Sequence, residues 1–366
     1  MGVRWISIDG TRRDFKRVMD IASFDLDGNA DSVEFCPYPT LHQLLAAATY
    51  TLQQDEDRPI RSGSISLFSA TASGLKLLDR VQTPGIFDIK WNSGVRETNG
   101  TSNSIAPHPL LAQATSDGFL TLYSLHPIEF SLSEVCKEEV SSSMCLCVDW
   151  GSNGNSISVG LSDGCVSTLA LREDQLQITQ SWAAHEYETW TVLFDACQSQ
   201  LLYTGSDDCS FSCWDLRQKS SSSMVFRNSK SHKMGVCSIA QCPSDSTILL
   251  TGSYDEFLRV WDVRCISRPV METSVCLGGG VWRLKYHPLI GGLVLAACMH
   301  NGFAIVKIDG ENVNILETYT KHDSLAYGAD WQRAACVDDG NKSGLLVATC
   351  SFYDRLLRIW KPYSLE

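Results

Sequence analysis

The chain has 366 residues, a formal net charge of −12 and an isoelectric point near 5.1. Its composition, with 44% hydrophobic and 20% charged residues, is typical of a globular protein and excludes an intrinsically disordered chain. The acidic balance disfavours direct binding to nucleic acid or to an anionic membrane surface and favours basic partners. No stretch is long and apolar enough for a transmembrane helix, so we expect no membrane span.

The fifteen cysteines are scattered along the chain, without the regular spacing of a disulfide framework and without a C-x-x-C pair. We interpret them as reduced thiols that pack in strands, and we expect neither a bound metal nor a cofactor. The first twenty residues carry five basic side chains and no unbroken apolar stretch, which argues against a secretory signal. These features predict a cytoplasmic protein that can also enter the nucleus.

In chain order, the predicted elements begin with an apolar segment at residues 18–26. Strands that end in an aromatic residue or a proline turn follow at intervals, at residues 33–37, 89–91, 148–150, 284–288 and 329–331. After each of them comes an apolar run, a tight turn of Ser, Asp and Gly, and a second, alternating run. No helical period competes with this pattern, which therefore predicts short antiparallel strands.

Two segments in the middle of the chain are direct repeats of one another. Residues 201–217 and 248–264 share the sequences T-G-S-x-D and W-D-x-R at a spacing of 47 residues. Weaker copies end at Phe68, Tyr123, Leu169, Val306 and Trp360, which brings the number of units to seven. Their spacing of roughly 45 to 55 residues is that of a WD repeat of about 40–45 residues with its loops. We therefore predict an all-β fold, a single seven-bladed WD40 β-propeller over residues 1–366.

The seventh unit lacks its outer strand, because the chain ends soon after Trp360. A blade without that strand would expose an unpaired edge. The apolar segment at residues 18–26 can supply it. We therefore predict that residues 1–26 include a closing strand, so that strands from the two ends of the chain pair and close the ring.

Most histidines fit the hydrogen-bonded set that WD repeats bury, in which a His, a Thr, an Asp and a Trp contact one another. The three sets are His185, Thr204, Asp208 and Trp214; His232, Thr251, Asp255 and Trp261; and His322, Thr349, Asp354 and Trp360. Because buried polar groups need partners, we assign these residues to structure. His300 differs, since it takes the place of the turn Asp and the preceding loop, residues 278–280, lacks the matching His. His300 is therefore a candidate functional residue.

Aromatic residues recur at a position that opens onto the channel mouth of propellers. Four residues before the end of an inner strand stand Phe87, Leu146, Trp190, Cys237, Trp282 and Tyr327, and just before the turn Asp stand Tyr254 and Tyr353. The carboxylates of Asp207 and Glu256 are near the same rim. Since ring faces and carboxylates both attract positive charge, this pattern indicates a cationic ligand. Ordinary packing, or a general protein-binding surface, is the alternative.

Six segments are more specific than a generic WD repeat. They are A-H-E-Y-E-T-W (184–190), M-G-V-C-S-I (234–239), T-G-S-Y-D-E (251–256), G-G-G-V-W-R (278–283), A-A-C-M-H-N-G-F (296–303) and Y-G-A-D-W (327–331). Together they resemble the WD-repeat methylesterases of the diphthamide pathway, closely in units four to seven and loosely in the first three. The resemblance implies hydrolysis of the methyl ester of methylated diphthine on a histidine of translation elongation factor 2, which frees a carboxylate for the final amidation. That intermediate carries a trimethylammonium group, which an aromatic mouth would attract.

The site residues follow from the chemistry of ester hydrolysis, which needs a nucleophile, a base and donors for the oxyanion. We assign His300 as the base, because an unperturbed imidazole is largely neutral at pH 7. The backbone N–H groups of Gly279 and Gly280 are the donors. Water is the first choice of nucleophile and Ser253 the second. The substrate-binding residues are Trp190, Trp282, Tyr254, Glu256, Tyr327 and Tyr353.

The two W-D-x-R sequences, at residues 214–217 and 261–264, leave an alternative open. They resemble the endings of substrate receptors that dock onto cullin ubiquitin ligases through exposed arginines, although such endings are common in WD repeats. A non-catalytic adaptor is therefore the second predicted function. In both cases we expect a monomer with a protein partner, which is translation elongation factor 2 as substrate or the adaptor subunit of a ubiquitin ligase.

Overall fold

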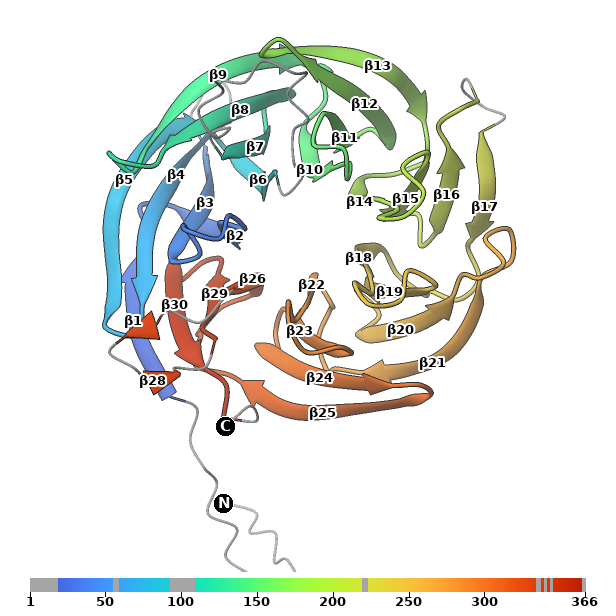
Figure 1. The fold of residues 1–366 in the computed structure, drawn as a ribbon. Helices are drawn as coiled ribbons and strands as arrows, with labels where there is room; N and C mark the ends of the chain where they lie inside the picture. The colour runs from blue at the N-terminus through green and yellow to red at the C-terminus, as the bar shows by residue number, and fades with distance from the viewer. Residues whose placement is uncertain are drawn as a thin grey trace, which may run out of the picture.

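The described residues form a ring of seven four-stranded antiparallel sheets around a central channel (Figure 1). The structure is a computed structural model and describes residues 19–54, 59–92, 109–218, 223–333, 337–338, 341–342 and 345–363. The predicted all-β, seven-bladed propeller is confirmed. The part of the chain that the structure describes contains no helix suited to crossing a bilayer.

The first four blades follow the chain from the inside of the ring outward. Blade 1 holds β2 (Asn29–Phe35), β3 (Leu44–Gln53), β4 (Ile60–Thr71) and β5 (Gly74–Pro84). Blade 2 holds β6 (Ile86–Trp91), β7 (Leu110–Thr115), β8 (Phe119–His126) and β9 (Ser131–Glu139). Blade 3 holds β10 (Cys145–Trp150), β11 (Ser156–Leu161), β12 (Cys165–Arg172) and β13 (Gln175–Ala183). Blade 4 holds β14 (Thr189–Phe194), β15 (Leu201–Ser206), β16 (Phe211–Asp215) and β17 (Met224–Asn228).

The last three blades continue this order. Blade 5 holds β18 (Val236–Gln241), β19 (Ile248–Ser253), β20 (Phe257–Asp262) and β21 (Val270–Cys276). Blade 6 holds β22 (Arg283–Tyr286), β23 (Leu293–Ala297), β24 (Phe303–Asp309) and β25 (Asn312–Tyr319). Blade 7 holds β26 (Ala326–Trp331), β29 (Val347–Ser351), β30 (Leu356–Lys361) and β1 (Met19–Asp25). A short hairpin of β27 (Val337–Asp338) and β28 (Asn341–Lys342) stands apart from the blades.

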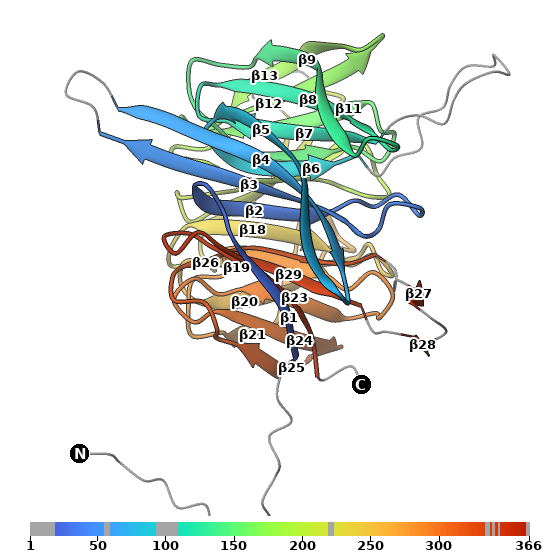
Figure 2. The same ribbon diagram turned by 90° about the vertical axis from the view of Figure 1, so that its left-hand side faces the viewer.

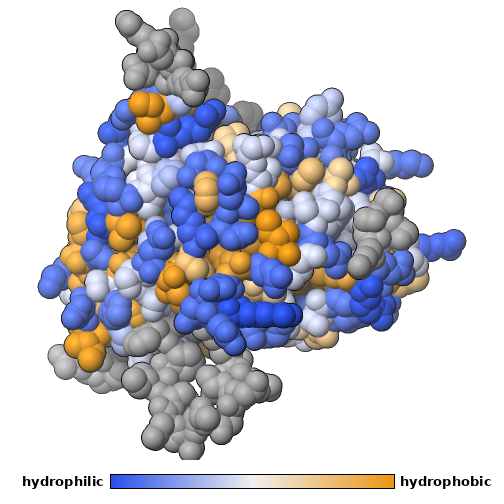
Figure 3. Space-filling view, turned by 90° about the horizontal axis from the view of Figure 1, so that it is seen from above, coloured by the Kyte–Doolittle hydropathy of each residue, from blue (hydrophilic) through white to orange (hydrophobic). Residues whose placement is uncertain are grey.

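The hydrophobic core lies between neighbouring blades. Each of the seven core clusters joins side chains from two consecutive blades, including one that joins blade 7 to blade 1. The inner strands are therefore covered on both faces, and β10 is buried at every position. The outer strands alternate, as in β13, so that the rim in Figure 3 is a mosaic of hydrophilic and hydrophobic residues.

The ring closes by pairing strands from the two ends of the chain, as predicted. β1 pairs antiparallel with β30, with Ala22 opposite Ile359 and Phe24 opposite Leu357. Figure 2 shows β1 lying along the last blade. The Phe24 ring also contacts Phe68 of blade 1 edge to face, at 4.9 Å between ring centroids. The closing strand thus covers the edge of blade 7 and packs against blade 1. Residues 1–18 lie outside the described residues.

The three predicted histidine sets form, with one difference. His185 contacts both Thr204 (Nε2 to Oγ1, 2.7 Å) and Asp208 (Nδ1 to Oδ2, 2.9 Å). The indole N–H of each of the three tryptophans donates to its Thr hydroxyl. In the other two sets, the predicted direct contact between His and Asp is wrong, because another side chain lies between them. Arg259 lies between His232 and Asp255, and Ser351 lies between His322 and Asp354.

Deleting residues 1–26 is expected to open the ring, because it leaves the β30 edge unpaired and uncovers apolar side chains between blades 7 and 1. A loss of about 3 kcal/mol would lower the melting temperature by roughly 4 °C. Thermal unfolding and light scattering measure the shift and the aggregation that should accompany it. Deletion of residues 1–18, which retains β1, is the control. A monomeric 1–26 deletion with an unchanged melting temperature would contradict this mode of closure.

Candidate active site at the channel mouth

Each inner strand departs from regular pairing near its start. The register skips one residue in β2, β6, β10, β14 and β18 and two in β26, and in blade 6 the N–H of Trp282 donates to Ala297 just before β22 begins. A β-bulge of this kind re-aims a side chain out of the ladder. The equivalent residues are Asp31, Phe87, Leu146, Trp190, Cys237, Trp282 and Tyr327, which we call the mouth ring. The bulges explain why the side chain at this one position of each inner strand points to the channel mouth.

Four aromatic residues meet at Trp282. Its ring stacks on Tyr327 at 4.8 Å and 25°, and its centroid lies 5.3 Å from Trp190 and 5.9 Å from Tyr254. Trp190 belongs to blade 4 and Trp282 to blade 6, so their contact requires that both rings project over the channel. The structure thus brings together four of the six predicted substrate-binding residues.

The aromatic contacts continue around the mouth through two residues that the repeat pattern misses. Phe352 lies 5.2 Å from Tyr327 and 6.3 Å from Tyr50, and Tyr50 lies 4.7 Å from Phe87. Tyr353, 69% exposed, packs against Phe352 at 5.0 Å. We call this whole set, from Trp190 to Phe87, the aromatic arc. The one sequence signal for Phe352 was the extra residue in the turn of unit seven. Tyr50 occupies no repeated position, so the repeat pattern could not have predicted its place in the arc.

Asp31 is the acidic member of the mouth ring and is not among the residues predicted from the sequence. The residue is 3% exposed, and its Oδ1 has no hydrogen-bond donor among the described residues. Burial raises the pKa of Asp31 to about 8; Arg283 opposes this shift and Asp88 adds to it. The signal was available, because Asp31 stands four residues before Phe35 at the end of β2.

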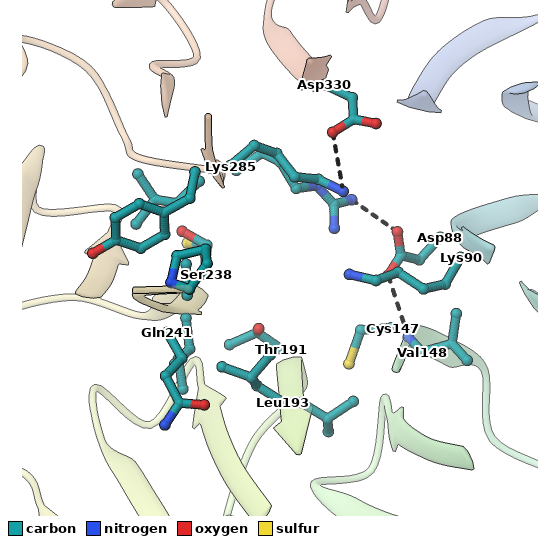
Figure 4. Close-up of a pocket in the computed structure, with 18 of the residues that line it drawn as sticks. Asp88, Lys90, Cys147, Val148, Thr191, Leu193, Ser238, Gln241, Lys285 and Asp330 are labelled. Carbon is teal, nitrogen blue, oxygen red and sulfur yellow. Dashed lines mark hydrogen bonds and ion pairs between the residues drawn. The ribbon is translucent and has the colours of Figure 1, made fainter. Parts of the chain in front are cut away.

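Beneath the mouth ring, a network of buried ion pairs borders a cavity of about 190 Å³ (Figure 4). Arg283 pairs with Asp88 at 3.1 Å, and Lys285 pairs with Glu34 at 3.1 Å. Burial alone would raise the pKa of Glu34, but Lys285 and then Lys90 overcome this effect and lower it. The network holds the inner strands of several blades in place under the aromatic residues.

The network also includes two further carboxylates. Lys90 lies 3.6 Å from Asp149, and Lys285 lies 3.7 Å from Asp330. The second of these pairs is visible in Figure 4. Asp149 and Asp330 each accept a backbone N–H from the next blade, at 2.9 Å and 2.8 Å. These charges are therefore engaged in joining blades.

His300 is exposed in the turn between β23 and β24. It lines an open hollow of about 500 Å³ together with residues 322–325 and Tyr353. No ring contact joins His300 to the aromatic arc in the described part of the chain, but Tyr353 belongs to both the hollow and the arc. His300 therefore lies beside the mouth.

Gly279 and Gly280 lie in the loop between β21 and β22, which packs against the turn that carries His300. A Cβ on Gly279 would come within 2.1 Å of the Cys298 carbonyl oxygen, and one on Gly280 within 2.7 Å of Met299 Sδ. The backbone contact requires glycine at 279, whereas at 280 the flexible Met299 side chain could move aside. Among the described residues, no acceptor faces the N–H group of either glycine. Both N–H groups are thus unpaired in the described residues, and both glycines are buried.

The remaining assigned residues are placed less centrally. Glu256 is exposed on the turn after β19, and its Oε2 lies 3.7 Å from Cys276 on an outer strand, away from the arc contacts. Ser253 is buried and donates to the Met234 carbonyl at 3.0 Å, so its hydroxyl is engaged in the turn. Burial also raises the pKa of the Cys237 thiol far above its usual range. Neither Ser253 nor Cys237 is therefore set up as a nucleophile.

The comparisons with known proteins agree with this fold. The family model for the WD domain, G-beta repeat, matches residues 224–262. A chain in the crystal structure of the mitotic checkpoint complex has a TM-score of 0.70 at 15% identity, covering 99% of this chain and 98% of that one. At that identity the likeness shows the fold alone.

Two relatives are similar over most of the chain. The mouse protein named diphthine methyltransferase is 35% identical over 85% of this chain and 69% of its own length. The Dictyostelium discoideum protein named diphthine methyltransferase homolog is 31% identical over 92% of this chain and 97% of its own length. The chain belongs to this family. The resemblance inferred from six sequence segments is thereby confirmed, although the relatives' names give methyl transfer as their activity.

Proposed function

We propose that this member of the diphthine methyltransferase family hydrolyses the methyl ester of methylated diphthine on translation elongation factor 2. Water would add to the ester carbonyl, the bond to the methoxy group would break, and methanol and the diphthine carboxylate would leave. The observation that carries the proposal is the aromatic arc around Trp282, which offers several ring faces at one point of the channel mouth.

A trimethylammonium group is the cation that such an arc suits best. It cannot donate hydrogen bonds, so carboxylates and ring faces recognise it through charge alone, and a desolvated cation–π contact is worth up to about 2 kcal/mol. Burial raises the pKa of Tyr254 and of Tyr327, so both phenols stay neutral and keep their rings available. Asp207 adds a carboxylate at the rim, where it accepts the Trp190 indole N–H at 3.3 Å.

The neighbouring groups favour hydrolysis over methyl transfer. Attack on an ester carbonyl builds an oxyanion, which the free N–H groups of Gly279 and Gly280 can stabilise. Transfer of a methyl group builds no oxyanion and would leave these donors without a role. His300 is exposed to solvent in the turn against which the glycine loop packs, and it can take a proton from the attacking water.

Hydrolysis is tested by incubating the purified protein with methylated elongation factor 2, with no methyl donor added. We expect stoichiometric release of methanol and a protein mass lowered by the replacement of a methyl group by hydrogen. S-adenosylmethionine, supplied in a parallel reaction, should change neither result. A requirement for that donor, or methylation of unmodified substrate, would identify a transferase instead.

Trp282 and His300 should separate by role. Trp282→Leu is expected to weaken substrate affinity by about thirtyfold, with turnover at saturation largely retained. His300→Ala is expected to lower turnover by a factor of about 10² to 10⁴ without a change in melting temperature. Steady-state kinetics of methanol release measures both effects.

Two variants serve as controls for this separation. Trp282→Phe keeps a ring at the centre of the arc and should bind nearly as well as the wild type. His126→Ala removes an exposed histidine at the end of β8 and should leave turnover unchanged. Wild-type turnover in His300→Ala would end the assignment of this histidine, while a Trp282→Leu variant with unaltered affinity would end that of the arc.

A second function, docking to the adaptor subunit of a cullin ubiquitin ligase, is favoured by two exposed arginines. The side chains of Arg217 and Arg264 are 70% and 75% exposed, and each pairs with the Asp of its own W-D-x-R sequence. They occupy equivalent positions on neighbouring blades 4 and 5.

A pull-down tests this second function. If docking occurs, wild-type protein captures the adaptor subunit and the double variant Arg217→Ala, Arg264→Ala does not. Arg172→Ala, which removes an exposed arginine from blade 3, is the matched control. Equal capture by the double variant, or no capture by any protein, would rule this docking mode out.

A further inference from the structure

We propose that Asp31 is the counter-charge of the quaternary ammonium site, and that its carboxyl group is protonated in the empty site and releases the proton when the cation binds. The inference rests on the proposed cation site at the aromatic arc and adds to it a specific residue and a pH dependence. It does not depend on whether an ester is subsequently cleaved. Four features of the described residues support it.

The first feature is the position of Asp31 next to the stacked aromatic rings. Asp31 lies in β2 of blade 1 and Tyr327 in β26 of blade 7. The two residues are therefore neighbours across the seam where the ring closes. Gly328 permits a close approach, because a Cβ there would lie 2.8 Å from the backbone nitrogen of Val33 and 3.1 Å from the carbonyl carbon of Ser32. Both residues also occupy the same bulge position of their inner strands.

The second feature is the lack of a partner. Asp31 is 3% exposed, yet its Oδ1 meets no donor, and no ion pair within the described residues holds its carboxylate. A buried carboxylate without partners is costly, and it is tolerated most easily when protonated. A ligand that brings a positive charge would remove this cost.

The third feature is the charge balance beneath the mouth ring. Among the described residues, Glu34, Asp88, Asp149 and Asp330 face an equal number of cations, Lys90, Arg283, Lys285 and Arg333. The network is therefore neutral without Asp31. An ionised Asp31 would be an excess negative charge, and one bound cation would restore neutrality.

The fourth feature is that the other groups facing Asp31 do not change charge near neutral pH. Burial raises the pKa values of Cys350 from β29, of Tyr327 from β26 and of Tyr254 from the turn after β19, so all three stay neutral. Arg283 stays charged, since burial is outweighed by Asp88 and its pKa is raised. Asp88 is held in its ion pair with Arg283.

The sign of the pH effect follows from this arrangement. Burial raises the pKa of Asp31 to about 8 in the free protein, so the carboxyl group is mostly neutral at pH 7. A cation binds the ionised form, which means that affinity is greatest above about pH 8. It should fall about tenfold for each unit below that value, until the lowered pKa of the complex is reached.

The experiment uses tetramethylammonium chloride as the probe and isothermal titration calorimetry on the full-length protein. We expect the dissociation constant to rise by roughly a hundredfold between one pH unit above and two units below the pKa. Titrations in two buffers that differ in ionisation enthalpy should show release of about one proton per cation near neutral pH. The uncharged molecule tert-butanol, similar in shape, should show no such pH dependence.

Asp31→Asn should abolish both the pH dependence and the proton release, leaving weak binding by the arc. The control Asp309→Asn removes an exposed carboxylate at the end of β24 and should behave like the wild type. The wild-type proton count keeps the test decisive even if Asp31→Asn fails to fold. Binding without proton release, pH dependence that persists in Asp31→Asn, or no binding at any pH would overturn the proposal. Proton-linked binding without methanol release would instead contradict only the proposed hydrolysis.

Discussion

The pairing of β1 with β30 is the interaction on which the candidate site depends. Without it, blades 7 and 1 would be the two open ends of the molecule, and Asp31 and Tyr327 would not be neighbours. A propeller blade buries its apolar faces only against the blades on either side, so closure completes the core as well as the channel mouth. The same strand pair thus completes the core and positions the candidate site.

The repeated bulge explains how a regular scaffold carries a specific site. Every inner strand presents one side chain to the mouth from the equivalent position. The fold requires only that this side chain fits the mouth, and any residue type that fits can stand there. In this chain those positions are mainly aromatic, with one carboxylate, and their spacing around the ring lets Trp282 contact three other rings. In the proposed function, recognition of a cation depends on a few residues of the mouth, while the ion pairs below them join the blades.

Binding and chemistry occupy adjoining parts of this face in the proposed function. The aromatic arc is partly buried and suits a group without hydrogen-bond donors, whereas the hollow with His300 is open to water, which hydrolysis consumes. Tyr353 borders both regions. A substrate presented on another protein could place its ammonium group in the arc and its ester in the hollow.

The sequence by itself determined the number of blades, the closing strand, the tryptophan and threonine contacts and most of the aromatic arc, because these features follow from repeat spacing and from equivalent positions within a repeat. The tertiary structure decided the rest. Arg259 and Ser351 entered two of the histidine sets because side chains of adjacent strands meet there, which a linear pattern does not encode. Tyr50 joined the arc from strand β3 and Phe352 from the turn after β29, both outside the repeat pattern. The environment of Asp31 arises from residues of several blades, since burial and the absence of a partner are properties of the closed ring rather than of any one unit.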